Sequence, residues 1–155
     1  MNYVESVRTK LGHQKIFLPG ARAIILNELG EVLLQLRNDM NFWGLPAGCI
    51  ELEESFQEGM IREVKEETGL DILEMEPMAL YSGKDLKVVY PNQDEVQLIS
   101  VTFIVRKWKG IPKADGIEGK ELQFFSLNQL PANLLPLHYQ TLMDYQEHDG
   151  HFRLK

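Results

Sequence analysis

A run of glutamates between residues 51 and 67 is the part of the sequence best suited to chemistry. It holds seven Glu and two basic residues, and so contributes −5 to the net charge of −7 that the 155-residue chain carries. Glu63, Glu66 and Glu67 are spaced so that they share one flank of a helix. Like charges at this spacing destabilise a helix by about 0.2–0.5 kcal/mol per pair, unless a divalent cation such as Mg²⁺ binds between them. The run therefore suggests a metal site, with a solvated acidic face as the alternative.

The glutamates lie in a segment that carries the end signals of a helix. Ser55 and Glu58 form a capping box and Gly69 provides a stop, which predicts a helix over about residues 55 to 68. Gly59 lies inside this helix at a cost of about 1 kcal/mol relative to alanine. This glycine either keeps space open beside the carboxylates or packs closely against a strand.

The segment before the helix, residues 38 to 54, lacks the periodic apolar positions of a regular element. It contains Gly44, Pro46 and Gly48, and we expect a long loop. Long loops in compact domains are often functional. The expected site therefore consists of this loop and the helix that follows it.

A motif joins the loop to the helix. From Gly48 to Leu70 the residues follow the pattern G-x5-E-x7-R-E-U-x-E-E-x-G-U, in which U is aliphatic, at every specified position. Seven fixed residues at this spacing coincide by chance about once in 10⁸ windows. The pattern is the Nudix box, and the chain resembles the Nudix (MutT-like) hydrolase family. Residues 43–46 and 124–131 are also similar to the family, so the resemblance covers about residues 20 to 131.

This resemblance implies an α/β fold, the Nudix α/β/α sandwich with a mixed β-sheet between helices. It also implies an enzyme that uses Mg²⁺ or Mn²⁺ to hydrolyse the diphosphate bond between a nucleoside diphosphate and another group, through attack of water at phosphorus. Many relatives are homodimers, so a homodimer is expected here too. The alternative is a non-catalytic Nudix domain that senses a ligand, but such domains often have eroded boxes and this box is intact.

Matching by position, the resemblance also implies roles for residues of the box. Glu63, Glu66 and Glu67 are expected to bind the metal, together with the backbone carbonyl of Ala47. Either Glu63 or Glu67 is expected to act as general base where it does not serve as a ligand. Arg62 belongs with the three glutamates to the expected catalytic residues.

Other residues of the box have structural roles in the family. Glu54 is expected to form an ion pair with Arg62 and so to hold the helix to its loop. Gly48 and Gly69 complete the structural set. Ala47 stands where glycine is common, a change that preserves the carbonyl ligand but reduces the conformational freedom of the loop.

Many relatives supply one further glutamate from a loop outside the box. Glu118 and Glu121 are the candidates here, and Glu118 is included in the expected catalytic set. Asp94 and Glu95 are weaker candidates. For each of the four, a solvated surface position is the alternative.

Residues near the expected cleft are candidates for binding the substrate. Arg22 and Arg37 lie on or at the ends of early strands, where a guanidinium can bind a phosphate through two hydrogen bonds. Their alternative is an ordinary surface position. Phe42 or Trp43 could stack on a base, although Trp43 is at least as well suited to packing beneath the loop.

The remaining periodicity predicts the elements that position the site within a single domain over residues 1–155. A short helix is expected at 3–12 and another from Pro136 to about 147. Residues 21–26 and 31–37 are expected to form a hairpin. Further strands are expected at 71–82, 85–90, 95–108 and 120–126.

Composition excludes several classes of protein. The pI near 5.1 argues against a nucleic-acid coating protein, which needs clustered Lys and Arg. The single cysteine, Cys49, allows no internal disulfide and fits a reducing compartment. No 18-residue apolar run and no amino-terminal targeting segment are present, so we expect a cytoplasmic protein that binds no membrane.

Overall fold

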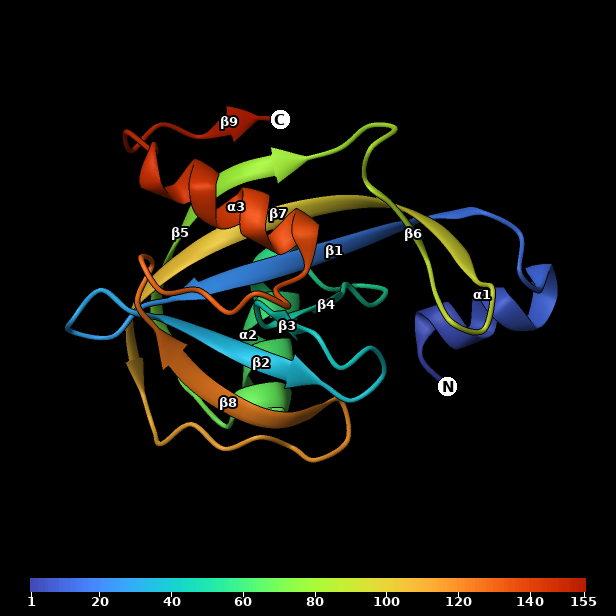
Figure 1. The fold of residues 1–155 in the computed structure, drawn as a ribbon. Coiled ribbons are helices and arrows are strands. Elements are labelled where there is room, and N and C mark those ends of the chain that lie inside the picture. Colours follow the sequence, from blue (N-terminus) through green and yellow to red (C-terminus); the bar gives the residue numbers. More distant parts are fainter.

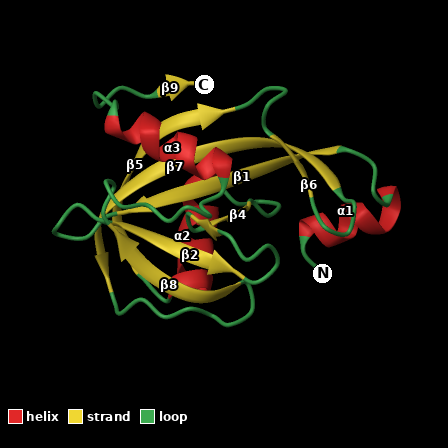
Figure 2. Cartoon of the chain, viewed as in Figure 1, coloured by secondary structure: helices red, strands yellow, loops and turns green.

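The computed structural model describes all residues from 1 to 155. Figure 1 shows the path of the chain, and Figure 2 distinguishes its helices from its strands. The elements in chain order are α1 (Tyr3–Leu11), β1 (Ile16–Ile25), β2 (Val32–Arg37), β3 (Trp43–Gly44), β4 (Ala47–Cys49), α2 (Phe56–Thr68), β5 (Asp71–Tyr81), β6 (Lys87–Val89), β7 (Glu95–Lys109), β8 (Gly119–Phe125), α3 (Pro136–Gln146) and β9 (Arg153–Leu154).

The strands form two sheets. The larger sheet has the order β4-β1-β7-β5-β9, with β6 paired to β7, and the smaller sheet has the order β3-β2-β8. Strands β1 and β7 are parallel along the whole of β1, and the short β9 is parallel to β5. The pairs β4–β1, β5–β7 and β6–β7 are antiparallel. The larger sheet is therefore mixed, as expected from the sequence.

Helices α2 and α3 cover opposite faces of the larger sheet (Figure 1). The two-residue period of β1 divides its side chains between them. Ala23 and Ile25 share one buried cluster with Val64 of α2, whereas Ile24 shares the other cluster with Leu142 of α3. This arrangement confirms the α/β/α sandwich.

The signals at the ends of α2 act as expected. The Ser55 hydroxyl accepts from the Glu58 amide while the Glu58 carboxylate accepts from the Ser55 amide, and Gly69 ends the helix in the left-handed conformation at φ 76°. Gly59 lies against the loop before the helix. A Cβ there would come within 2.6 Å of the Ile50 side chain, so this glycine packs closely, but against the loop and not against a strand.

The expected hairpin of residues 21–26 and 31–37 is wrong as a pairing, although both strands exist. Strands β1 and β2 belong to different sheets, and only one bridge, between Leu26 and Val32, joins them antiparallel. The long tertiary pairing of β1 with β7 outweighs the local turn. The strands expected at 85–90 and 95–108 correspond to β6 and β7, which form a hairpin in which the Tyr90 amide donates to the Asp94 carbonyl at 2.9 Å.

Other differences lie in short elements. The expected loop over residues 38–54 contains the strands β3 and β4, and β1 begins at Ile16 rather than at residue 21. Strand β9, at the carboxyl end, has no signal in the sequence because its two residues extend only by pairing with β5. No helix is both long and apolar enough to span a bilayer.

Helix α1 is held to the rest of the protein by polar contacts and has no buried residue. The Tyr3 amide donates to the Glu51 carboxylate at 2.8 Å, and the Arg8 guanidinium donates to the Glu95 carbonyl at 2.8 Å. In Figure 1 the helix lies beside β6, at the end of the molecule away from β9. It thus joins the loop before α2 to the β6–β7 hairpin.

Candidate active site

Three carboxylates from two distant segments meet at one point. Oxygen atoms of Glu63 and Glu67 on α2 and of Glu118 before β8 lie within 4.8 Å of one another. Strand pairing brings Glu118 there, because β8 pairs with β2 so that Gly119 lies opposite Arg37. Glu63 and Glu67 are buried, whereas Glu118 is exposed to solvent. The cluster therefore has a buried side and a side open to water.

Glu67 is the most buried member of the cluster. Glu67 is 1% exposed, and its Oε2 accepts a hydrogen bond from the Ala47 amide at 3.2 Å. Its Oε1 has no hydrogen-bond partner. Burial, and then the neighbouring Glu118 and Glu63 carboxyls, raise the pKa of Glu67 well above its ordinary value. A buried oxygen without a partner is costly, so this carboxyl requires a proton or a cation.

Glu63 lies against the backbone of the loop. Burial raises its pKa to about 7, although the ion pair with Arg62 acts in the opposite direction. A Cβ at Gly48 would collide with the Glu63 carboxyl group. The glycine thus leaves the space that this carboxyl group occupies, in agreement with its expected structural role.

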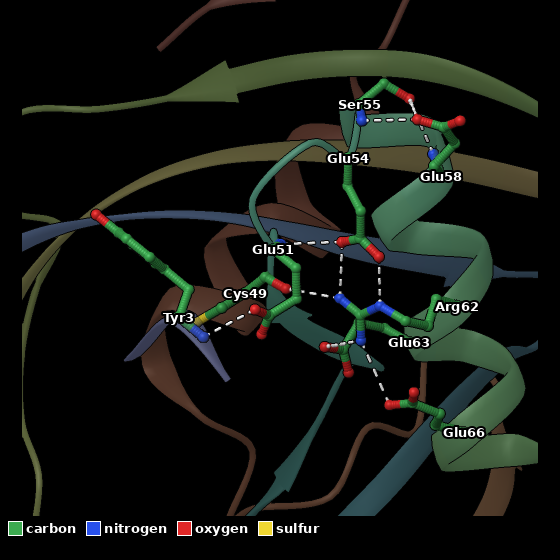
Figure 3. A network of polar contacts seen from close by, with 9 residues as sticks. All are labelled: Tyr3, Cys49, Glu51, Glu54, Ser55, Glu58, Arg62, Glu63 and Glu66. Carbon is green, nitrogen blue, oxygen red and sulfur yellow. Dashed lines mark hydrogen bonds and ion pairs between the residues drawn. The ribbon is translucent and has the colours of Figure 1, made fainter. Parts of the chain in front are cut away.

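Arg62 holds the loop and the helix together (Figure 3). Its Nε and Nη2 donate to the two oxygens of Glu54 at 2.6 and 2.9 Å, which is the ion pair that the resemblance implies. Nη1 donates to Glu63 at 2.8 Å, and Nη2 also donates to the Cys49 carbonyl at 3.0 Å. The guanidinium is therefore occupied by groups of the protein itself.

Glu66 does not join the three-carboxylate cluster. Its side chain is 59% exposed and makes one contact of 3.4 Å with Arg62, one helical turn away. Spacing alone groups Glu66 with Glu63 and Glu67, but the structure gives the third place to Glu118. The reason is that Glu66 lies further round the helix toward solvent.

The cluster fits a divalent cation on three observations. Its donors are all carboxylate oxygens, which hard cations prefer. One of them, Oε1 of Glu67, is buried without a partner. The backbone beside Glu63 is kept free of side-chain atoms by Gly48. Like charges at this separation repel one another, and a cation between them would convert the repulsion into attraction.

A cavity of about 910 Å³ extends from the cluster toward α3. Its lining includes Glu63, Glu118 and Arg37, together with the first residues of α3. A volume of this size is in the range of small-molecule sites. Glu63 and Glu118 therefore face a space large enough for a small molecule.

The two arginines expected to bind substrate both line this cavity. The Arg37 guanidinium binds Asp39 through two hydrogen bonds of 2.9 and 2.7 Å, which further raise its pKa. Arg22 is only 3% exposed and donates to the Thr141 hydroxyl at 2.9 Å. Burial lowers its pKa to about 10, which still leaves it charged at neutral pH.

The expected stacking role of Trp43 is wrong. Trp43 is 9% exposed, does not line the cavity and packs edge-on against Phe125 with 4.9 Å between ring centroids. It belongs to the core beneath the loop, as its alternative interpretation stated. Phe42 is 40% exposed and also lies outside the cavity lining.

The other acidic candidates lie away from the cluster. Asp94 forms ion pairs with Arg8 and His13, and Glu95 is exposed at the start of β7. Glu121 is exposed on β8 and does not line the cavity. Each therefore has the surface position given as its alternative.

Some residues of the cavity had no signal in the sequence. These residues belong to no motif, and tertiary packing brings them together from β2, β7, α3 and the β6–β7 hairpin. They are Gln35, Ser100, His138 and Val88.

Comparisons with known proteins agree with this geometry. The family model described as the NUDIX domain matches residues 17–145. The chain is 34% identical over 136 residues to an ADP-ribose pyrophosphatase of Methanocaldococcus jannaschii, covering 84% of this chain and 76% of that protein. It is 31% identical over 131 residues to a Bacillus subtilis protein provisionally named 8-oxo-dGTP diphosphatase, covering 84% and 81%.

The fold also resembles that of a solved structure. The MutT NUDIX hydrolase of Burkholderia pseudomallei has a TM-score of 0.71 to this chain at 22% identity, over 83% of this chain and 97% of that one. At this identity the likeness concerns the fold alone.

Proposed function

The chain belongs to the Nudix family and is a Nudix pyrophosphohydrolase, and from this premise we propose that it uses a divalent cation to hydrolyse a nucleoside diphosphate linked to another group. The observation that carries the proposal is the cluster of Glu63, Glu67 and Glu118 at the wall of the cavity. Within this cluster, the Oε1 atom of Glu67 has no hydrogen-bond partner and is available as a ligand for a cation.

Glu63, Glu67 and Glu118 would hold Mg²⁺ or Mn²⁺, and Glu66 and the Ala47 carbonyl are proposed as further ligands. A cation bound there lowers the pKa of the attacking water and neutralises the charge that develops on the leaving phosphate. The need for it follows from charge, because a segment with a net charge of −5 repels a diphosphate.

The protein's own groups position the reactants. Arg62 fixes Glu63 and the loop through its contacts with Glu54 and the Cys49 carbonyl. Arg37 lines the cavity, where its guanidinium can orient a phosphate once it turns from Asp39. Where Glu118 does not hold the cation, its exposed carboxylate is proposed to accept the proton of the attacking water. General-base catalysis of this kind contributes about 10²- to 10⁴-fold.

The proposed substrate class is a nucleoside diphosphate derivative. The relatives are named for ADP-ribose and for 8-oxo-dGTP, which share a diphosphate and differ in the group attached to it. The cavity volume suits either compound. A homodimer stays a prediction from the resemblance.

The test is hydrolysis of ADP-ribose and 8-oxo-dGTP with Mg²⁺, with Mn²⁺ and with EDTA, in ¹⁸O-labelled water. We expect turnover with a cation, none with EDTA, and ¹⁸O in one phosphate product. Glu67→Gln is expected to lower kcat by at least about 10²-fold. Glu121→Gln is the matched control, because Glu121 lies on β8 outside the cavity.

Two results would overturn the proposal. One is full turnover of the wild type in EDTA, and the other is unchanged turnover in Glu67→Gln. Binding of these nucleotides by the wild type without any hydrolysis would instead favour the ligand-sensing function.

A further inference from the structure

A buried guanidinium at the wall of the cavity, that of Arg22, has no counterion. Arg22 lies on β1 and donates to Thr141 of α3, so it is on the face of β1 that α3 covers and not on the face that packs against α2. The residue is 3% exposed and lines the cavity, and its Nη2 has no hydrogen-bond partner. Its polar contact is the Thr141 hydroxyl, and the Tyr81 ring lies 5.7 Å from the guanidinium carbon.

No acidic side chain pairs with this guanidinium. Asp144 is the acidic residue of α3, but its carboxylate accepts a hydrogen bond from the Tyr81 hydroxyl at 2.7 Å and not from Arg22. A buried charge without a partner is strongly destabilising, because it has lost its hydration without gaining an ion pair. The fold therefore maintains a positive charge at this wall of the cavity, and a bound anion would neutralise it.

The neighbouring groups are donors as well. Nδ1 of His138 accepts from the Leu45 amide at 2.8 Å, so the proton of the neutral imidazole is on Nε2, which can donate. Helix α3 begins at Pro136, which has no amide hydrogen, and the His138 amide donates to the Leu135 carbonyl at 3.0 Å. The Leu137 amide is therefore the donor that the first turn leaves free. Leu135, Pro136 and His138 line the cavity. The positive end of the helix dipole is thus directed toward the same space.

We propose that Arg22, His138 and the amino-terminal end of α3 form an oxyanion subsite, which binds a phosphate group of the substrate outside the cation-bound diphosphate. The assignment of this phosphate to a substrate rests on the proposed function, whereas oxyanion binding itself does not. A neutral nucleobase satisfies hydrogen bonds but leaves the charge of Arg22 uncompensated, and for this reason the anion is preferred. The subsite would make the enzyme selective for substrates with an additional phosphate.

The test is calorimetric titration with inorganic phosphate in the presence of Mg²⁺. The wild type is compared with Arg22→Met, Arg22→Lys and the control Arg106→Met. Arg106 is a half-exposed arginine on β7 that pairs with Glu76 and does not line the cavity. Arg22→Met is expected to weaken phosphate binding by about 10- to 100-fold, the usual contribution of a charge-assisted hydrogen bond. Arg22→Lys should restore part of the affinity, and Arg106→Met should bind as the wild type does.

Melting temperatures measured without phosphate separate binding from folding. Replacing an uncompensated buried charge by an apolar side chain is often neutral or stabilising, so Arg22→Met should melt at or above the wild-type temperature. Equal phosphate affinity in the wild type and Arg22→Met would overturn the proposal, since the phosphate would then bind elsewhere, such as at the Mg²⁺ site. The same titrations are run with adenosine. If Arg22→Met loses adenosine binding but keeps the wild-type phosphate affinity, the proposal is also overturned. None of these outcomes requires hydrolysis, so failure of the proposed function is detected separately.

Discussion

Glu67→Gln is expected to stabilise the metal-free protein and to remove its stabilisation by Mg²⁺. Glu67 is 1% exposed, and its carboxylate lies within 4.8 Å of those of Glu63 and Glu118. Two unit charges at this distance repel by about 3 kcal/mol at an effective dielectric constant of about 20. Burial adds a cost on the same scale, because it raises the pKa of Glu63 to about 7 from an ordinary 4.5 and each pKa unit corresponds to about 1.4 kcal/mol.

The sign follows from the direction of the pKa shifts. A carboxyl whose pKa is raised in the folded state binds more protons there than in the unfolded state, so stability falls as pH rises from about 4.5 toward the folded pKa. At pH 8 without metal, Glu67→Gln should therefore gain about 3 kcal/mol, equivalent to about 6–12 °C in Tm. Near pH 4.5 the gain should largely disappear. Mg²⁺ at about 100 times its Kd should stabilise the wild type by about 2.7 kcal/mol, but not this variant.

The assay is urea denaturation at pH 8 and pH 4.5, in EDTA and in Mg²⁺, with Glu121→Gln as the control for the loss of one exposed negative charge. The reasoning is refuted if Glu67→Gln in EDTA at pH 8 is no more stable than the wild type. It is also refuted if Mg²⁺ stabilises both proteins equally, because the cation would then bind without Glu67.

Two further predictions concern residues that line the cavity, Gly48 beside the carboxylates and His138 on α3. Gly48→Ala should lower kcat by about 10²-fold and weaken Mg²⁺ binding, because the new Cβ displaces the Glu63 carboxyl group; wild-type kinetics in a Mg²⁺ titration would contradict this. Burial lowers the pKa of His138 well below its ordinary value, so below about pH 6.5 the unfolded state takes up a proton that the folded state does not. As the pH is lowered below about 6.5, the free energy of unfolding should therefore fall by up to about 1.4 kcal/mol per pH unit because of His138. Urea unfolding should show a steeper dependence on pH in the wild type than in His138→Asn. Equal slopes in the two proteins would contradict this prediction.

The sequence by itself determined the features that depend on near neighbours along the chain. The capping box of Ser55 and Glu58, the helix stop at Gly69 and the ion pair of Glu54 with Arg62 are all as expected. Each connects residues within a few turns of one helix or its adjoining loop, where spacing dictates geometry. The Nudix box is recognisable because its contacts are local.

The tertiary structure decided which residues from distant segments meet. Pairing of β2 with β8 places Glu118 in the cluster, where spacing would have placed Glu66. Packing of the smaller sheet buries Trp43, and packing of α3 on β1 encloses Arg22 at the cavity wall. These outcomes depend on strand pairing and burial across long stretches of chain, which residue spacing does not encode.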